Sequence, residues 1–195
     1  HPLVKDKLDD IDKIVIETQE SGDRIINKTG SLDNPADRDH CIQYMAAIGL
    51  IKGALVAEDY EDDVATLPIV DQIREKMQVS ENTRFSQEYL EADKRSIGNS
   101  IQVFFKDGTS THVESVDYPV GHRRRRAEGI PLLIEKFERY VSGHLGQEQA
   151  SQISQICTSQ ATFESTIVDE MMALLSVHWV ADDLGRREFY SFFVK

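Results

Sequence analysis

A strand–turn–strand pattern in the middle of the sequence constrains the fold most. In residues 97–106 apolar and more polar side chains alternate, which is the period of a strand with one buried face. Asp107 and Gly108 follow, and an Asp-Gly pair favours the tight turn of a β-hairpin. Residues 111–118 then return as the partner strand, so the chain must form an antiparallel pair and cover one of its faces. The alternating apolar residues are Ile101, Val103 and Phe105.

Helical periodicity dominates the rest of the sequence. Two further strand-like runs occur at residues 12–19, rich in β-branched side chains, and at residues 85–90. Segregated strands and helices predict the α+β class: a small antiparallel sheet with a hairpin, packed against several helices. Helices are expected at residues 40–56, 68–77, 130–145, 147–159 and 167–177, with a short one after the acidic run 59–63.

Composition argues against several classes of protein. The 195 residues carry a formal net charge of −12 and are 40% hydrophobic, as in ordinary soluble globular proteins. This acidity argues against a nucleic-acid partner, which requires a basic face. The apolar runs are shorter than the ~18 residues of a membrane span, so no membrane partner is expected. Cys41 and Cys157 are too few for a disulfide framework and lack CxxC spacing, which favours a reducing compartment.

Four consecutive arginines at residues 123–126 concentrate positive charge in this acidic chain. They follow a Pro-Val-Gly turn at residues 119–121 and open the next helix, where backbone N–H groups add to the positive potential. Guanidinium groups bind carboxylates through two parallel hydrogen bonds. The run therefore suits a small polycarboxylate. The alternative is a solvated run that pairs with some of the 34 acidic side chains.

Three segments of the sequence resemble the MmgE/PrpD family. They are residues 118–131, read YPVGHRRRRAEGIP, residues 37–45, read DRDHCIQYM, and the acidic residues 58–62. The resemblance implies a lyase with a helical domain, an α+β lid domain and an active site between them. Its implied reaction eliminates water from 2-methylcitrate to give 2-methyl-aconitate in propionate catabolism, the methylcitrate cycle. It implies a tricarboxylate substrate and no cofactor, iron–sulfur cluster included. A cis-aconitate decarboxylase-like activity of the same family is the alternative.

The resemblance and the residue chemistry together suggest the site. His122, beside the arginines, and His40, at a helix start, are the candidate catalytic residues because imidazole titrates near neutral pH. The structural alternatives are a histidine bonded to the adjoining loop for His122 and a capping network for His40. The acidic residues 58–63 suit Mg²⁺ or, more simply, a solvated helix start, so no metal is expected. The candidate substrate-binding residues are Arg123, Arg124, Arg125, Arg38, Gln43 and Tyr44.

The expected domain organisation follows from the same resemblance. Residues 1–127 correspond to the α+β lid-like domain, residues 128–177 to C-terminal helices that would pack on a helical domain, and residues 178–195 to a tail of unknown role. Because the sequence opens at His1, we expect a piece of a longer polypeptide. The full-length protein is expected to be a homodimer, in the mitochondrial matrix of a eukaryote or the cytoplasm of a bacterium. A non-catalytic interaction module is the alternative for the chain by itself.

Overall fold

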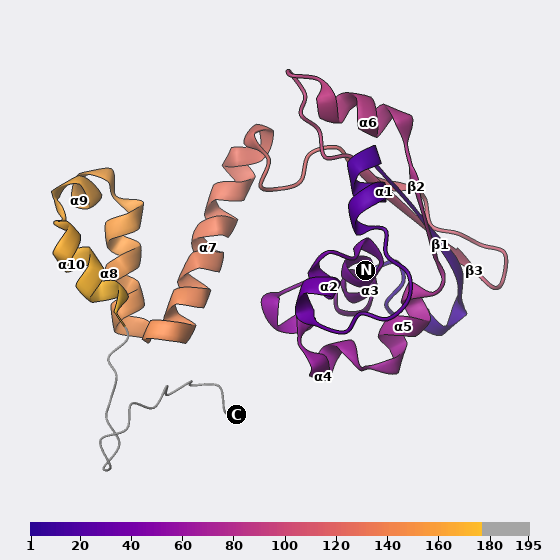
Figure 1. Cartoon of the computed structure of the whole chain (residues 1–195), viewed down its shortest axis with the longest axis horizontal. Coiled ribbons are helices and arrows are strands. Elements are labelled where there is room, and N and C mark those ends of the chain that lie inside the picture. Colours follow the sequence, from indigo (N-terminus) through magenta and orange to yellow (C-terminus); the bar gives the residue numbers. More distant parts are fainter. Residues whose placement is uncertain (177–195) are drawn as a thin grey trace, which may run out of the picture. The chain divides into compact units, whose positions relative to one another are not determined.

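The computed structural model describes residues 1–176 and divides the chain into two compact units. Unit 1 is His1–Pro119, drawn from indigo to magenta in Figure 1, and unit 2 begins at Val120. The expected domain boundary after residue 127 stays a prediction. The expectations for residue 177 and for the tail at residues 178–195 lie outside the described residues.

Unit 1 is built on a four-stranded sheet in the order β2-β1-β3-β4. The strands are β1 (Ile11–Thr18), β2 (Met77–Glu81), β3 (Asn99–Phe105) and β4 (Glu114–Val116). β3 pairs antiparallel with β1 and with β4, and Gly108 adopts φ +84° in the turn between β3 and β4, as an Asp-Gly hairpin requires. β1 pairs parallel with β2, however, so the sheet is mixed. The α+β class is confirmed, and the entirely antiparallel sheet is wrong because the chain returns to β2 through helices.

One face of the sheet carries the hydrophobic core of unit 1. Ile14, Ile16 and Val103 are buried there against helices α3 and α5. On the opposite face the Lys13 ammonium lies 4.7 Å from the centroid of the Phe104 ring, a cation–π contact. The helices of unit 1 are α1 (Glu20–Ile26), α2 (Pro35–Asp39), α3 (Ile42–Lys52), α4 (Asp62–Ala65), α5 (Pro68–Arg74) and α6 (Thr83–Leu90), with 3₁₀ turns η1 (Leu8–Asp10) and η2 (Ala57–Tyr60).

The strand expected at residues 85–90 is wrong, because this segment forms helix α6. The side chain of Asn82 accepts a hydrogen bond from the amide of Arg84 and so caps the helix start. Phe85 is buried, and its ring lies directly over Gly98. A Cβ atom at position 98 would come within 2.3 Å of that ring, so the glycine leaves the space that the helix needs.

Over residues 120–176, unit 2 contains helices only, apart from the loop that opens it. They are η3 (Arg123–Arg125), α7 (Arg126–Leu145), α8 (Gln147–Thr158), α9 (Gln160–Ser165) and α10 (Val168–Leu175). The C-cap of α7 is Gly146, which adopts φ +82°. α7 packs against α8 (Figure 1). Ile153 of α8 is buried. The helices expected at 130–145, 147–159 and 167–177 are confirmed over the described residues. None of the helices in residues 1–176 combines the length and apolar character of a membrane span.

One face of α7 is apolar and only partly covered by α8. Ile130 and Leu133 are 50% and 56% exposed, and together with Ile134, Phe137, Cys157 and Thr158 they line an apolar groove of about 200 Å³. The periodicity therefore predicts the apolar stripe correctly, while the structure leaves its outer half exposed.

Candidate functional site

His122 begins the arginine-rich turn η3 and is bound to it. Its Nδ1 accepts a hydrogen bond of 3.2 Å from the backbone N–H of Arg124, so the imidazole caps η3. A ring nitrogen that accepts a hydrogen bond carries no proton, and a neutral imidazole must then carry its proton on Nε2. In this state His122 is a hydrogen-bond donor through Nε2. The loop-bonded alternative for His122 is therefore what the structure contains, and a site role stays a prediction.

Arg125 of η3 pairs with a carboxylate of α7. Arg125 binds Glu128 with two hydrogen bonds, 2.7 Å from Nη2 and 3.2 Å from Nε. The hydrogen bond raises the pKa of Arg125 and lowers the pKa of the Glu128 carboxyl below its usual range. Arg123 and Arg124 are exposed on the turn, and Arg126 is exposed at the start of α7. An anion in solvent can therefore reach these members of the run.

Arg38 lies in unit 1 and is buried, with a side chain only 5% exposed. Its two Nη atoms donate 2.6 Å hydrogen bonds, one to the carbonyl of Tyr60 and one to the carboxylate of Asp62. Its Nε is buried and has no hydrogen-bond partner among the described residues. The guanidinium thus holds the segment η2–α4 against α2. Substrate binding by Arg38 stays a prediction.

Tyr44 continues this buried network. Its hydroxyl donates to the carbonyl of Asp59, and its ring stacks on Tyr60 with centroids 6.0 Å apart. Burial raises the pKa of Tyr44, so the phenol stays protonated. The Asp59 carboxylate is buried as well and accepts from Lys52 and from the amide of Val56. The acidic run at 58–62 therefore supplies a structural carboxylate.

Gln43 reaches a separate cavity of about 390 Å³ in unit 1. Its side chain is buried, donates to Asn27 at 2.6 Å and accepts from the amide of Lys28 at 3.2 Å. The guanidinium of Arg74, at the end of α5, donates to the carbonyl of Gly30 at 2.9 Å across the same cavity. Lys28 and Arg74 place two cations at this cavity. No sequence signal marks either of them, because a lysine in a loop and an arginine in the last turn of a helix are ordinary. The lining residues are Lys28, Thr29, Gly30, Ser31, Gln43, Asp71, Arg74, Glu75 and Met77.

His40 follows α2 and is largely exposed. Its Nδ1 contacts the Asp39 carboxylate, which can only accept a hydrogen bond when ionised. The ring proton therefore lies on Nδ1 in the neutral state, and Nε2 presents a lone pair. This tautomer is the opposite of the one found at His122. A carboxylate that holds one imidazole nitrogen in this way orients the other as a base.

The expected site residues thus fall into two groups. Arg38, His40, Gln43 and Tyr44 lie together at the junction of α2 and α3 in unit 1, and His122 begins η3 in unit 2 together with the three arginines. Within residues 1–176, no set of three or more histidine, cysteine, aspartate or glutamate side chains is arranged to hold a metal ion.

Comparison with known proteins identifies the relatives of this chain. Residues 1–160 match the model of the MmgE/PrpD C-terminal domain. The chain belongs to the MmgE/PrpD family. The arginine turn, the α2–α3 junction and the acidic turn η2 all lie within the matched residues, so the family resemblance of these three segments is confirmed.

Curated members of the MmgE/PrpD family cover most of the chain. It is 49% identical over 166 residues to "2-methylcitrate dehydratase, mitochondrial" of Yarrowia lipolytica, over 85% of this chain and 32% of the relative. It is 46% identical to "2-methylcitrate dehydratase" of Salmonella typhimurium and 44% identical to that of Escherichia coli K12, in each case over 85% of this chain and 34% of the relative. The chain therefore spans about a third of the length of these relatives.

Proposed function

We propose that this chain is the C-terminal portion of a 2-methylcitrate dehydratase, a hydro-lyase that converts 2-methylcitrate to 2-methyl-aconitate. The observation that carries the proposal is the 44–49% identity to curated proteins of that name. Arg123 and Arg124 support it, since exposed guanidinium groups beside a helix start suit a substrate with three carboxylates. In a eukaryote the protein would reside in the mitochondrial matrix and in a bacterium in the cytoplasm.

The two histidines would take different parts in the dehydration. Removal of a proton next to a carboxylate requires a base, and Nε2 of His40 presents a lone pair because Asp39 holds Nδ1. The negative charge that develops on the carboxylate and on the departing hydroxyl requires hydrogen-bond donors. Nε2 of His122 is such a donor because Nδ1 is occupied by the amide of Arg124.

The arginines are tested by comparing alanine variants of the full-length enzyme. Arg123→Ala and Arg124→Ala, singly and together, should raise KM for 2-methylcitrate by about 10–100-fold with a smaller effect on kcat, because they anchor groups that do not react. Arg139→Ala, which removes an equally exposed charge from α7, is the matched control and should leave both constants unchanged. Unchanged kcat/KM in the double variant would remove the arginines from the site.

The role of His122 is tested by two variants that each retain one half of the imidazole. Asn places a carbonyl oxygen near the Nδ1 position and keeps the cap on η3, whereas Gln places an amide N–H near Nε2 and loses the cap. If Nε2 contacts the substrate, His122→Gln should retain more kcat than His122→Asn, which should lose about 10²–10³-fold. The reverse order would assign His122 to capping alone.

His40 is tested through the pH dependence of the reaction. A base must be deprotonated to act, so kcat/KM should fall at acidic pH if His40 removes the proton. His40→Gln should lower kcat/KM by about 10²–10⁴-fold and abolish this acidic limb. An acidic limb that persists unchanged in the variant would exclude His40 as the base.

In the full-length protein, the exposed apolar face of α7 would pack against the remainder of the polypeptide. The full-length protein would also form a homodimer. Soluble monomers rarely expose large contiguous apolar patches, and this face carries Ile130, Leu133 and Ile134. The isolated 195-residue chain should therefore self-associate or bind a hydrophobic dye while folded, and it should not turn over 2-methylcitrate. Light scattering over a concentration series and an activity assay check both. A strictly monomeric chain without dye binding would contradict the assignment.

A further inference from the structure

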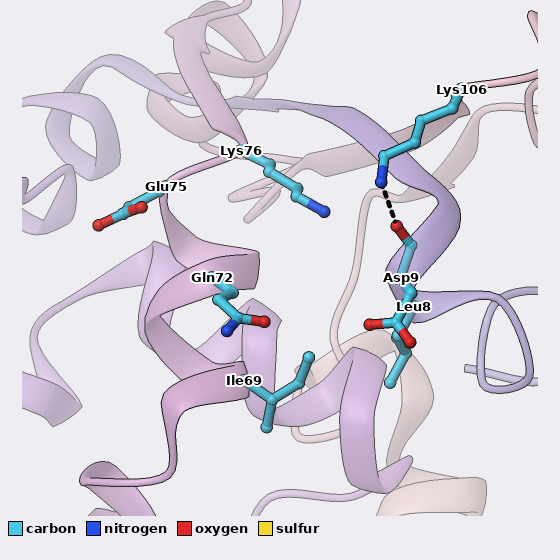
Figure 2. A pocket seen from close by; sticks show the side chains of 7 residues that line it. All are labelled: Leu8, Asp9, Ile69, Gln72, Glu75, Lys76 and Lys106. Carbon is cyan, nitrogen blue, oxygen red and sulfur yellow. Dashed lines mark hydrogen bonds between the residues drawn. The ribbon is translucent and has the colours of Figure 1, made fainter.

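Unit 1 contains a second cavity, of about 560 Å³, at the end of the sheet where β1 and β2 begin and β3 ends. It lies between the 3₁₀ turn η1, the end of α5 and the residue after β3 (Figure 2). None of the residues expected from the sequence to bind substrate lines it. The lining residues are Leu8, Asp9, Ile69, Gln72, Glu75, Lys76 and Lys106.

Two ammonium groups point into this cavity from the same side. Nζ of Lys76 donates to the carbonyl of Ile11 at 2.7 Å, and Nζ of Lys106 donates to the carbonyl of Asp9 at 2.8 Å. The two carbonyls are two residues apart, so one short segment holds both charges beside the same space (Figure 2). Each ammonium has three donors and uses one of them in these contacts.

Neither lysine forms an ion pair with a carboxylate of residues 1–176, since no such oxygen lies within 4.0 Å of either Nζ. Like charges held close together repel, and a small anion between them would remove that repulsion. Glu75 also lines the cavity, but it directs its carboxylate away from the two ammonium groups and so is not their ion-pair partner (Figure 2).

The opposite side of the cavity has a different chemistry. The Asp9 carboxylate and the Gln72 amide lie across the space from the ammonium groups, above the apolar side chains of Ile69 and Leu8 (Figure 2). An ionised carboxylate only accepts hydrogen bonds, so it favours a ligand that donates one. It also disfavours a ligand that is negatively charged at both ends.

We propose that this cavity binds a small hydroxycarboxylic acid, with its carboxylate between Lys76 and Lys106 and a hydroxyl donating to Asp9. The ammonium donors supply charge-assisted hydrogen bonds to the carboxylate, and Gln72 provides a further neutral contact. This site is independent of the proposed dehydratase reaction, because none of its residues takes part in that proposal.

The test measures binding of L-lactate, a hydroxy acid with a single carboxylate, to the 195-residue chain by calorimetry and by backbone NMR. We expect saturable binding with one site per chain at a Kd between about 0.1 and 10 mM, with shift changes at residues 8–11, 72–76 and 106. Propionate, which lacks the hydroxyl, should bind at least about threefold more weakly. Inorganic phosphate should also bind more weakly, because Asp9 opposes its second charge.

Charge-neutralising variants supply the second arm of the test. Lys76→Met and Lys106→Met keep the aliphatic stem and should each weaken L-lactate binding by about tenfold. Lys136→Met, which removes the same charge from α7 in unit 2, is the control and should bind as the unchanged chain does. The thermal transition of each variant without ligand reports whether it is folded, and the NMR map of the unchanged chain does not depend on any variant.

Several results would overturn the proposal. They are the absence of saturable L-lactate binding up to about 10 mM, shift changes outside the cavity, or equal affinity in both single lysine variants. Equal affinity for propionate would refute the hydroxyl contact with Asp9, and tighter binding of phosphate would refute the carboxylate assignment.

Discussion

Replacement of Arg38 by methionine should destabilise unit 1, whether or not substrate is present. Methionine fills much of the same volume but cannot donate the 2.6 Å hydrogen bonds to the Tyr60 carbonyl and the Asp62 carboxylate. Hydrogen bonds from a charged group contribute about 1.5–3 kcal/mol each. The variant also relieves the cost of burying a guanidinium whose Nε has no hydrogen-bond partner among the described residues. The difference predicts a loss of about 2–4 kcal/mol in the free energy of unfolding.

The matched control removes the other end of the ion pair. Asp62→Ala removes only one of the two hydrogen bonds, and the Asp62 side chain is 80% exposed, so this variant should cost about 1–2 kcal/mol, less than Arg38→Met. Urea unfolding followed by circular dichroism gives the free energies. Hydrogen exchange of residues 56–66 shows whether the loss is local to η2 and α4, which Arg38 holds.

The same experiment separates two roles for Arg38. A residue that only contacts substrate would leave the stability of the isolated chain unchanged when it is replaced. A free energy of unfolding of Arg38→Met within about 0.5 kcal/mol of that of the unchanged chain would show that the Arg38 contacts with Tyr60 and Asp62 do not stabilise unit 1, contrary to this prediction.

Three further outcomes follow from the structure. Burial raises the pKa of Tyr44, so its contribution to stability is present below the ordinary pKa of 10.0 and lost as pH rises above it; Tyr44→Phe should reduce this alkaline loss in pH-dependent thermal melts. The hydrogen bond from Lys94 lowers the pKa of Glu88, so the contribution of Glu88 to stability is present above the ordinary pKa of 4.5 and lost as pH falls below it. Glu88→Gln should therefore lose less stability than the unchanged chain in an acid titration of unfolding. Gly129→Ala should destabilise α7 by about 1–3 kcal/mol, although alanine favours helices, because its Cβ would lie 2.3 Å from the Val120 carbonyl; an unchanged melting temperature would contradict that contact.

Several features of the fold could be predicted because the interactions that form them are local. The hairpin around Gly108 follows from turn chemistry and alternation within about ten residues, and the long stripe of α7 follows from its period. Helix α6 could not be predicted, because eight residues give too short a period to separate helix from strand. Its state depends on the space beneath Phe85 that Gly98 leaves, thirteen positions further along the chain.

The same distinction between local and distant interactions applies to the candidate site. The sequence by itself determined the arginine run at a helix start and the family motifs, since residue type and immediate order are enough for both. Only the tertiary structure decided that Arg38 is buried against η2 and that Lys76 and Lys106 enter one cavity. These outcomes depend on which carbonyls and carboxylates the folded backbone brings within hydrogen-bond distance. For the two lysines those partners lie 65 and 97 positions away in the chain, far beyond the reach of any local pattern.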